Sequence, residues 1–230
     1  MLFDFRYAMI IWPLFCIGGF AFHLLKRGLK FFLTMKGLAS CIPFVFSLIS
    51  SLWFVAGALD LKLLSYNPAW SFYAALHGIF LGWIFVGCLA FLTMRTGASR
   101  IYLLGCYLSF ALFLCVAFGI DGVPYLKPIG VVGFSLMMPL WIAHYAFHLE
   151  KSKKLSRTFA FISLSTIVLS MTLALLNEFW AEFPRVMFGL PTMVLTHGLL
   201  NSLVAVPCFF LAIVFEELAS QKSSHESCLF

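Results

Sequence analysis

The chain has 230 residues, of which 63% are hydrophobic and only 10% are charged, and its mean hydropathy is +1.02. About a quarter of the residues in soluble domains are charged, so this composition excludes a soluble globular protein. The net charge of +6 does not indicate nucleic-acid binding, because the basic residues adjoin apolar stretches, where membrane topology and anionic lipids explain them. We therefore expect a membrane protein whose main partner is the lipid bilayer and which binds no nucleic acid.

Seven long apolar stretches follow one another, separated by short polar connections. About 20 apolar residues form a helix that crosses the ~30 Å hydrocarbon core, and stretches this long exclude the shorter strands of a membrane barrel. The predicted spans are 8–25, 37–59, 70–94, 101–120, 128–149, 158–178 and 192–216. We expect an all-α membrane protein with one seven-helix transmembrane domain over 1–216, followed by a short polar tail at 217–230.

The basic residues are distributed unevenly between the two sides of this predicted bundle. One side receives eleven of the fifteen: Lys26, Arg27, Lys30, Lys36, Arg95, Arg100, Lys151, Lys153, Lys154, Arg157 and Lys222. The other side receives four: Arg6, Lys62, Lys127 and Arg185. Cytoplasmic loops carry the excess of Lys and Arg. The sequence therefore predicts an N-terminus outside and a cytoplasmic C-terminus.

Ionisable and polar groups at membrane depth are candidates for function, because burying them is costly. His77 and His197 lie at similar depth in the third and seventh spans, and each is followed by Gly, which permits close helix approach. Asn201 follows His197 by four residues and shares its helix face. We predict that these groups form a polar pocket in the outer third of the bundle. The residues expected at its mouth are Asp60, Asn177 and Glu178.

Other interpretations of these polar residues stay open. His77, His197 and Asn201 can be interhelical hydrogen-bond partners that only hold the helices together. His144 and His148, four residues apart, are weak metal candidates, but no carboxylate lies between them as in the metalloprotease pattern. The seven Cys residues are scattered without a C-x-x-C pair, and no nucleotide or haem motif occurs. We predict neither a metal site nor a cofactor.

The nine residues from Met193 to Asn201, M-V-L-T-H-G-L-L-N, resemble a Met-x-x-Thr-His-Gly-x-Leu-Asn stretch of the YndJ-like family of bacterial membrane proteins. The string at 75–80, A-L-H-G-I-F, is similar to an earlier helix of that family, and the resemblance covers about 70–216. After Asn201 the chain departs from the family's Asn-Ala-x-Gly-Phe. The resemblance implies a multi-pass protein of the bacterial cytoplasmic membrane that carries a transporter label, and it points to His77, His197 and Asn201.

Two classes of function fit these observations. In the first, the pocket binds or transports a small solute or a proton, or the chain is an accessory subunit; seven spans are few for alternating access, which favours a homodimer. In the second, the protein is an intramembrane enzyme, a hydrolase or cyclase, which acts on a lipid-like substrate by acid–base chemistry of His and carboxylate groups. The sequence predicts the first and keeps the second as the alternative.

Overall fold

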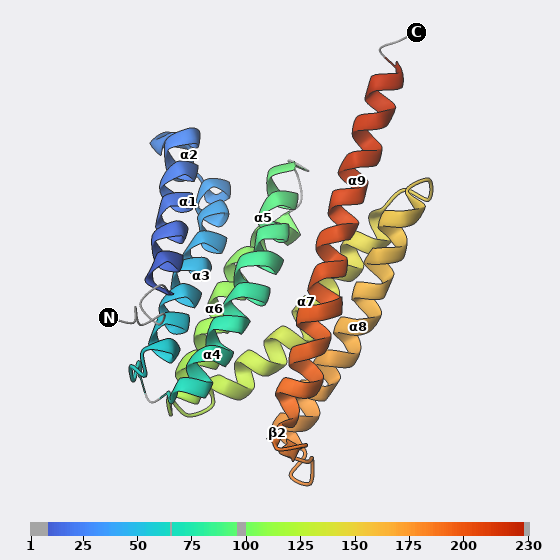
Figure 1. The fold of residues 1–230 in the computed structure, drawn as a ribbon. Helices are drawn as coiled ribbons and strands as arrows, with labels where there is room; N and C mark the ends of the chain where they lie inside the picture. Colours follow the sequence, from blue (N-terminus) through green and yellow to red (C-terminus); the bar gives the residue numbers. More distant parts are fainter. Residues whose placement is uncertain (1–8, 65, 96–99, 228–230) are drawn as a thin grey trace, which may run out of the picture. The chain divides into compact units, whose positions relative to one another are not determined.

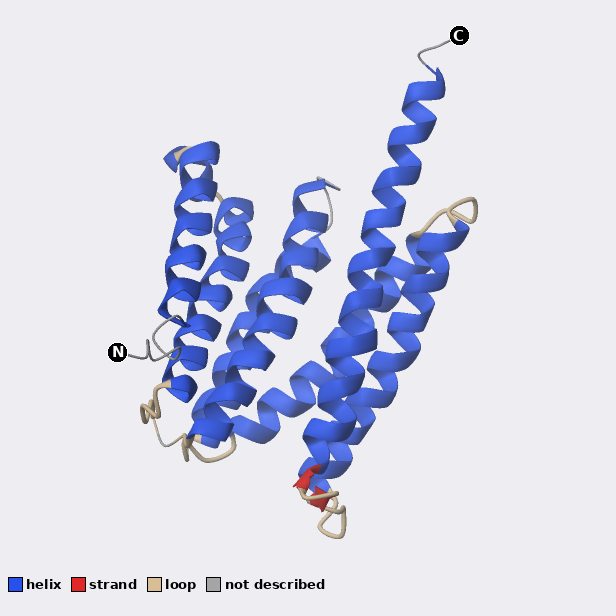
Figure 2. Ribbon diagram, in the orientation of Figure 1, coloured by secondary structure: helices blue, strands red, loops and turns tan. Residues whose placement is uncertain are grey.

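The computed structural model describes residues 9–64, 66–95 and 100–227, and nearly all of this part of the chain is helical (Figure 1, Figure 2). The contacts within the chain divide it into two compact units, Met1–Pro124 and Tyr125–Phe230. That residues 1–216 form a single transmembrane domain stays a prediction.

The first unit is arranged around one central helix, α3. Its elements are α1 (Ile11–Arg27), α2 (Leu29–Phe32), α3 (Met35–Ala58), α4 (Pro68–His77), the π-helical η2 (Gly78–Phe85), α5 (Val86–Arg95) and α6 (Arg100–Ile120). Segments α4, η2 and α5 follow one another without a break and form a single long helix over Pro68–Arg95. Helix α3 packs against α1, against this long helix and against α6.

Local sequence explains where these helices begin and end. Gly28 ends α1 with a φ of 75°, a conformation that other residues rarely adopt. The Thr34 side chain caps α3 by accepting a hydrogen bond from the Gly37 amide at 3.0 Å. Asn67 caps α4 in the same way, with Pro68 at the first helical position, where its missing donor is not needed.

A close crossing joins η2 to α3. A Cβ atom added at Gly78 would lie 2.0 Å from Ser50 Oγ, and one at Gly82 would lie 2.2 Å from the ring of Phe46. These contacts leave no room for a side chain at either glycine. The predicted role of Gly78 in close helix approach is therefore confirmed.

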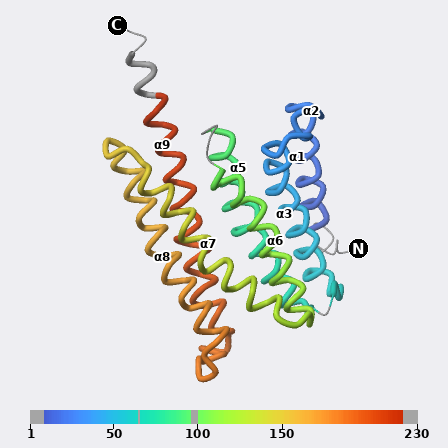
Figure 3. The backbone as a smooth tube through the Cα atoms, turned by 180° about the vertical axis from the view of Figure 1, so that it is seen from behind, coloured from blue at the N-terminus to red at the C-terminus, as the bar shows by residue number. Residues whose placement is uncertain are grey.

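The second unit is arranged around α8. Its elements are α7 (Leu126–His148), α8 (Lys154–Phe179), strands β1 (Val186–Met187) and β2 (Leu190–Pro191), the π-helical segments η3 (Val194–Gly198) and η4 (Asn201–Ala205), and α9 (Val206–Ser227). Helix α8 packs against α7 on one side and against η3, η4 and α9 on the other. The antiparallel pair β1–β2 forms a short hairpin in the connection after α8, and the chain then returns alongside α8 (Figure 3).

Three serines of α8, spaced seven residues apart, form hydrogen bonds to the neighbouring helical segments η3, η4 and α9. Ser156, Ser163 and Ser170 are all buried. The first two hydroxyl groups donate hydrogen bonds to the carbonyls of Ala212 at 2.6 Å and Ala205 at 2.7 Å. Seven residues are about two helical turns, so the serines share one face of α8. In a bilayer such a row stabilises helix contact, because each hydroxyl group finds an acceptor on the opposite helix.

The two units repeat the same order of parts. The string Ala-Phe-His-Leu-x-Lys occurs at 21–26 and again at 146–151, toward the end of α1 and of α7. A central helix follows in each unit, and then a helix that contains a His-Gly pair and π-helical turns. Ser50 precedes His77 by 27 residues, and Ser170 precedes His197 by the same number.

The chain is an all-α, multi-pass membrane protein. Within the described residues, six helices are long and apolar enough to cross a membrane, and they begin at Met35, Pro68, Arg100, Leu126, Lys154 and Val194. Helix α1 occupies most of the first predicted span, but its 17 residues lie at the lower limit for a spanning helix. Seven spans and the orientation therefore stay predictions. The last helix continues past the predicted span end at 216 as far as Ser227.

Candidate functional site

The most polar buried position in the second unit is His197, on the π-helical segment η3. Its side chain faces α8 and is only 8% exposed. The Nδ1 atom lies 3.1 Å from the backbone carbonyl of Ser170 and 3.0 Å from Ser170 Oγ. A π-helical turn changes the direction in which side chains leave a helix, and such turns are frequent at functional sites.

These contacts support an assignment of the ring nitrogen of His197 that carries the proton in the neutral form. The Ser170 carbonyl can only accept a hydrogen bond, so Nδ1 is the donor in that contact. Ser170 Oγ then donates to the backbone carbonyl of His197 at 3.3 Å. We therefore assign neutral His197 as the Nδ1–H tautomer, which leaves Nε2 as an acceptor.

Asn201 completes the group from the next turn of the same helix. Its Nδ2 lies 3.2 Å from His197 Nε2, so the amide donates to this ring nitrogen. The other amide atom, Oδ1, is buried and has no hydrogen-bond partner among the described residues. Buried polar atoms are nearly always satisfied, so this acceptor can still take a hydrogen bond from a donor outside the described residues.

The group can adapt to either protonation state of His197. Protonation at Nε2 converts this atom into a donor, and a rotated Asn201 amide can then offer Oδ1 to it. The Ser170 carbonyl continues to accept from Nδ1. Nothing here favours the alternative of an intramembrane hydrolase or cyclase that uses acid–base chemistry of His and carboxylate groups, because the candidate carboxylate of Glu178 is paired with Lys127.

The structure places Glu178 and Asn177 at the end of α8. Glu178 Oε2 forms an ion pair with Lys127 Nζ, near the start of α7, at 2.6 Å. The backbone carbonyl of Asn177 accepts a hydrogen bond from Arg185 in the following connection. Glu178 therefore links two helices of the second unit, and its predicted role at the mouth of a pocket stays a prediction.

His77 and Asp60 belong to the first unit. His77 ends α4 with an exposed side chain, and its Nδ1 bonds the carbonyl of Tyr73 one turn earlier at 2.9 Å. Asp60 is exposed in the turn after α3, with a φ of 55°. His197 lies in the second unit, so a pocket shared with His77 stays a prediction. Gly198 does not have the predicted role in close helix approach, because a Cβ atom there would meet nothing nearer than Met193 O at 3.6 Å.

The imidazole rings of His144 and His148 stack on each other, with their centroids 4.2 Å apart. His148 Nδ1 donates to the His144 carbonyl at 2.6 Å. This contact does not involve Nε2 of His148 and does not itself bear on metal binding, because ligating histidines commonly donate the other ring N–H to a carbonyl. Across the described residues, no three His, Cys, Asp or Glu side chains come together in a way that could hold a metal ion.

A second polar cluster, which the sequence did not reveal, lies where α7, α8 and α9 come together at the basic end of the second unit. Glu216 of α9 accepts a hydrogen bond from Tyr145 Oη at 2.9 Å and forms an ion pair with Lys153 at 3.4 Å. Lys153 also donates to Ser220 Oγ at 3.0 Å. Both charged side chains are about 15% exposed. The cluster therefore connects the three helices through largely buried polar contacts.

A model of the family described as YndJ-like protein matches residues 7–205, which include His77, His197 and Asn201. No curated protein and no solved structure matches the chain. The match extends over most of the chain and reaches well beyond the segment at 193–201 that first pointed to this family. The chain belongs to the YndJ-like family.

Proposed function

We propose that this membrane protein binds a small polar solute or a proton at the group formed by Ser170, His197 and Asn201, and that it transports this ligand or serves as the binding subunit of an assembly. The observation that carries the proposal is the buried Oδ1 of Asn201, which has no partner among the described residues although it lies beside His197. A group that only held helices together would be expected to satisfy its own atoms.

The chemistry of the site limits the ligand. An unsatisfied carbonyl oxygen accepts from O–H or N–H groups, so the solute would carry a hydroxyl or an amine group. A proton fits as well, because an imidazole ring can take up a proton and Asn201 can reorient to accept from the new N–H. An intramembrane histidine with an adjustable partner is typical of a proton relay.

The cytoplasmic membrane of a bacterium is the location that the family resemblance supports, and a homodimer stays part of the proposal. His77, in the other unit, is kept as a second candidate residue.

The test uses purified full-length protein and two measurements. Proteoliposomes that contain a pH-sensitive dye would report proton uptake under a potassium diffusion potential. Thermal unfolding would be followed with ammonium, ethanolamine and ethylene glycol as probes. The informative variant is Asn201→Leu, and Thr172→Val, which removes an exposed hydroxyl group of α8, is its control.

We expect a proton flux or a ligand-induced rise in the unfolding midpoint for the wild type and for Thr172→Val. Asn201→Leu should lose this response while it still accumulates in the membrane. If the wild type shows neither response, or if Asn201→Leu responds as the wild type does, the group has a structural role and the proposal is wrong.

A further inference from the structure

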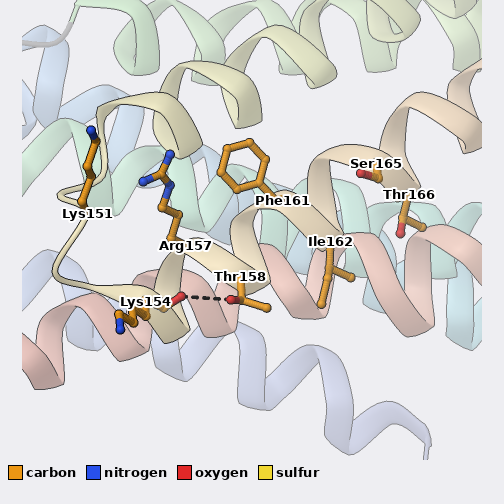
Figure 4. Close-up of a pocket in the computed structure, with 8 residues that line it drawn as sticks. All are labelled: Lys151, Lys154, Arg157, Thr158, Phe161, Ile162, Ser165 and Thr166. Carbon is orange, nitrogen blue, oxygen red and sulfur yellow. Dashed lines mark hydrogen bonds between the residues drawn. The ribbon is translucent and has the colours of Figure 1, made fainter.

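A groove of about 750 Å³ lies on the outer surface of α8, at the end where this helix begins (Figure 4). Its volume falls within the roughly 300–1,000 Å³ of typical ligand sites. Lys151 and Lys154 lie at one end of the groove, and Ser165 and Thr166 lie at the other. The wall between them contains Arg157, Phe161 and Ile162, so the groove changes from cationic to apolar along the helix.

The cations at the charged end of the groove have no carboxylate partner among the described residues. None of Lys151, Lys154 and Arg157 forms an ion pair with a carboxylate of the described residues. The neighbouring Lys153 differs, because it turns away from the groove to Glu216. The guanidinium group of Arg157 lies 5.5 Å from the centre of the Phe161 ring, which holds it over the groove.

The beginning of α8 adds to this positive potential. No side chain caps the helix at Lys153, and the first turn contains no acidic residue. The amide groups of a helix N-terminus carry a partial positive charge that favours an anion. The backbone and the three side chains thus place positive charge at the same point.

The length of the groove corresponds to one leaflet of a bilayer. From Lys154 to Thr166 the chain advances twelve residues, or about 18 Å at 1.5 Å per residue. Half of a ~30 Å hydrocarbon core is about 15 Å. A phosphate group at the lysines would therefore leave an acyl chain running past Phe161 and Ile162 toward the middle of the membrane.

We propose that this groove is a specific binding site for an anionic phospholipid. Lys151, Lys154 and Arg157 bind the head-group phosphate, and the apolar wall of α8 accommodates an acyl chain. Charge complementarity favours an anionic phospholipid over a zwitterionic one, because a zwitterionic head group offers no net negative charge to the three cations. The proposal does not depend on the ligand of the His197 group.

The experiment measures lipid binding to the full-length protein in neutral detergent. Native mass spectrometry would count bound lipid, and the unfolding midpoint would report stabilisation by dioleoyl-phosphatidylglycerol. Dioleoyl-phosphatidylcholine and inorganic phosphate are the two comparison ligands. We expect the phosphatidylglycerol to bind and to raise the midpoint, and the other two to have little effect.

Two sets of variants locate the binding. The triple variant Lys151→Gln, Lys154→Gln and Arg157→Gln should weaken phosphatidylglycerol binding by on the order of a hundredfold. Ile162→Trp keeps every charge but narrows the apolar part of the groove, and it should also weaken binding. If the triple variant does not fold, Arg157→Gln alone replaces it, with a smaller loss expected.

The matched control removes the same charge from the equivalent place in the first unit. Lys26, Arg27 and Lys30 follow the same Ala-Phe-His-Leu string, and their replacement by Gln should leave binding unchanged. An equal loss in this control would show that only diffuse surface charge attracts the lipid. Equal protection by inorganic phosphate, or full binding by Ile162→Trp, would likewise overturn the proposal.

Discussion

Ser170 and His197 bond to each other through both backbone and side chain. The imidazole Nδ1 lies 3.1 Å from the serine carbonyl, and the serine hydroxyl group lies 3.3 Å from the histidine carbonyl. This reciprocal pair fixes the orientation of the ring and directs Nε2 toward Asn201. A ring held in this way can exchange a proton at Nε2 while its other nitrogen stays bonded.

Replacement of His197 separates a functional role from a structural one. His197→Gln keeps a hydrogen-bonding side chain but removes the imidazole ring, which can take up and release a proton. We expect this variant to accumulate normally in the membrane and to lose proton or solute responses. His197→Leu should in addition lose about 0.6 kcal/mol of unfolding free energy, the average value of an interhelical hydrogen bond in a membrane. A fully active Gln variant would assign His197 to the structure alone.

Ser170→Ala provides a comparison within one helix. If all three serines of α8 only hold helices together, Ser156→Ala, Ser163→Ala and Ser170→Ala should each cost about 0.6 kcal/mol of unfolding free energy and leave function intact. We expect the function to change for Ser170→Ala alone, because only this serine has its hydroxyl group beside an imidazole ring, with Oγ 3.0 Å from His197 Nδ1. Unfolding in detergent and the proton-uptake measurement together distinguish the two cases.

The sequence predicted the membrane class, the approximate helix limits and the pairing of His197 with Asn201, because hydropathy and helix spacing are local properties. It did not identify Ser170 as the partner of His197, although the serines at 156, 163 and 170 repeat with a period that places them on one helix face. Which face meets the next helix depends on packing, and hydropathy carries no such information in a lipid environment.

The two His-Gly pairs also show that local sequence does not predict which helices come into contact. Gly78 and Gly198 follow their histidines identically in sequence, yet only Gly78 lies in close contact with another helix. The difference arises from the neighbouring helix, where Ser50 faces Gly78. The β1–β2 hairpin and the π-helical turns were also absent from the expectations, since they depend on pairing and strain rather than on composition.

A glycine in the first unit tests the close crossing of η2 and α3. Gly82→Ala would bring a methyl group to 2.2 Å from the ring of the fully buried Phe46, which must then shift. We expect a loss of about 1–3 kcal/mol of unfolding free energy. Gly87→Ala, farther along the same long helix, meets nothing nearer than 4.0 Å and should be neutral or stabilising. Equal effects in the two variants would contradict this packing.

The two ion pairs of the second unit should differ in strength. In the pair of Lys127 with Glu178 the lysine side chain is 41% exposed, whereas Lys153 and Glu216 are 15% and 14% exposed. We expect Glu178→Gln to cost less than about 1 kcal/mol of unfolding free energy, with the effect vanishing in high salt. Glu216→Gln should cost about 2 kcal/mol, because it leaves Lys153 without its counter-charge. Unfolding measurements at low and high salt would distinguish the two pairs.

The membrane topology can be tested at turns that the structure places between helices. With an outside N-terminus and seven spans, a reporter inserted at Gly28 or after Ser152 should lie in the cytoplasm. Reporters at Gly122 and at Gly189 should lie outside. Gly28 matters most, because it follows α1, the helix at the lower limit of spanning length. If a reporter at the N-terminus lay on the same side of the membrane as the reporter at Gly28, α1 would be removed from the set of spans.

Tyr66, in the connection before α4, gives a prediction for alkaline pH. Burial, and secondarily the negative charge of Asp121, raises the pKa of Tyr66 to about 12. Its hydroxyl group donates to the Ala117 carbonyl at 3.4 Å, and its ring stacks on Trp53. The folded protein therefore holds this proton more tightly than the unfolded chain, whose tyrosine titrates near pH 10. Below about pH 10 the stabilisation is fully present, and it is lost as the pH rises toward 12.

Tyr66→Phe removes this titrating group and keeps the ring. The variant should therefore lose less unfolding free energy than the wild type between about pH 10 and 12, although it is slightly less stable at neutral pH, because its hydrogen bond is missing. Tyr125→Phe, at a side chain that is 80% exposed, serves as the control and should follow the wild type. Unfolding free energies measured at several values of pH would give the slopes. The same slope for Tyr66→Phe and for the wild type would show that this phenol does not couple folding to alkaline pH.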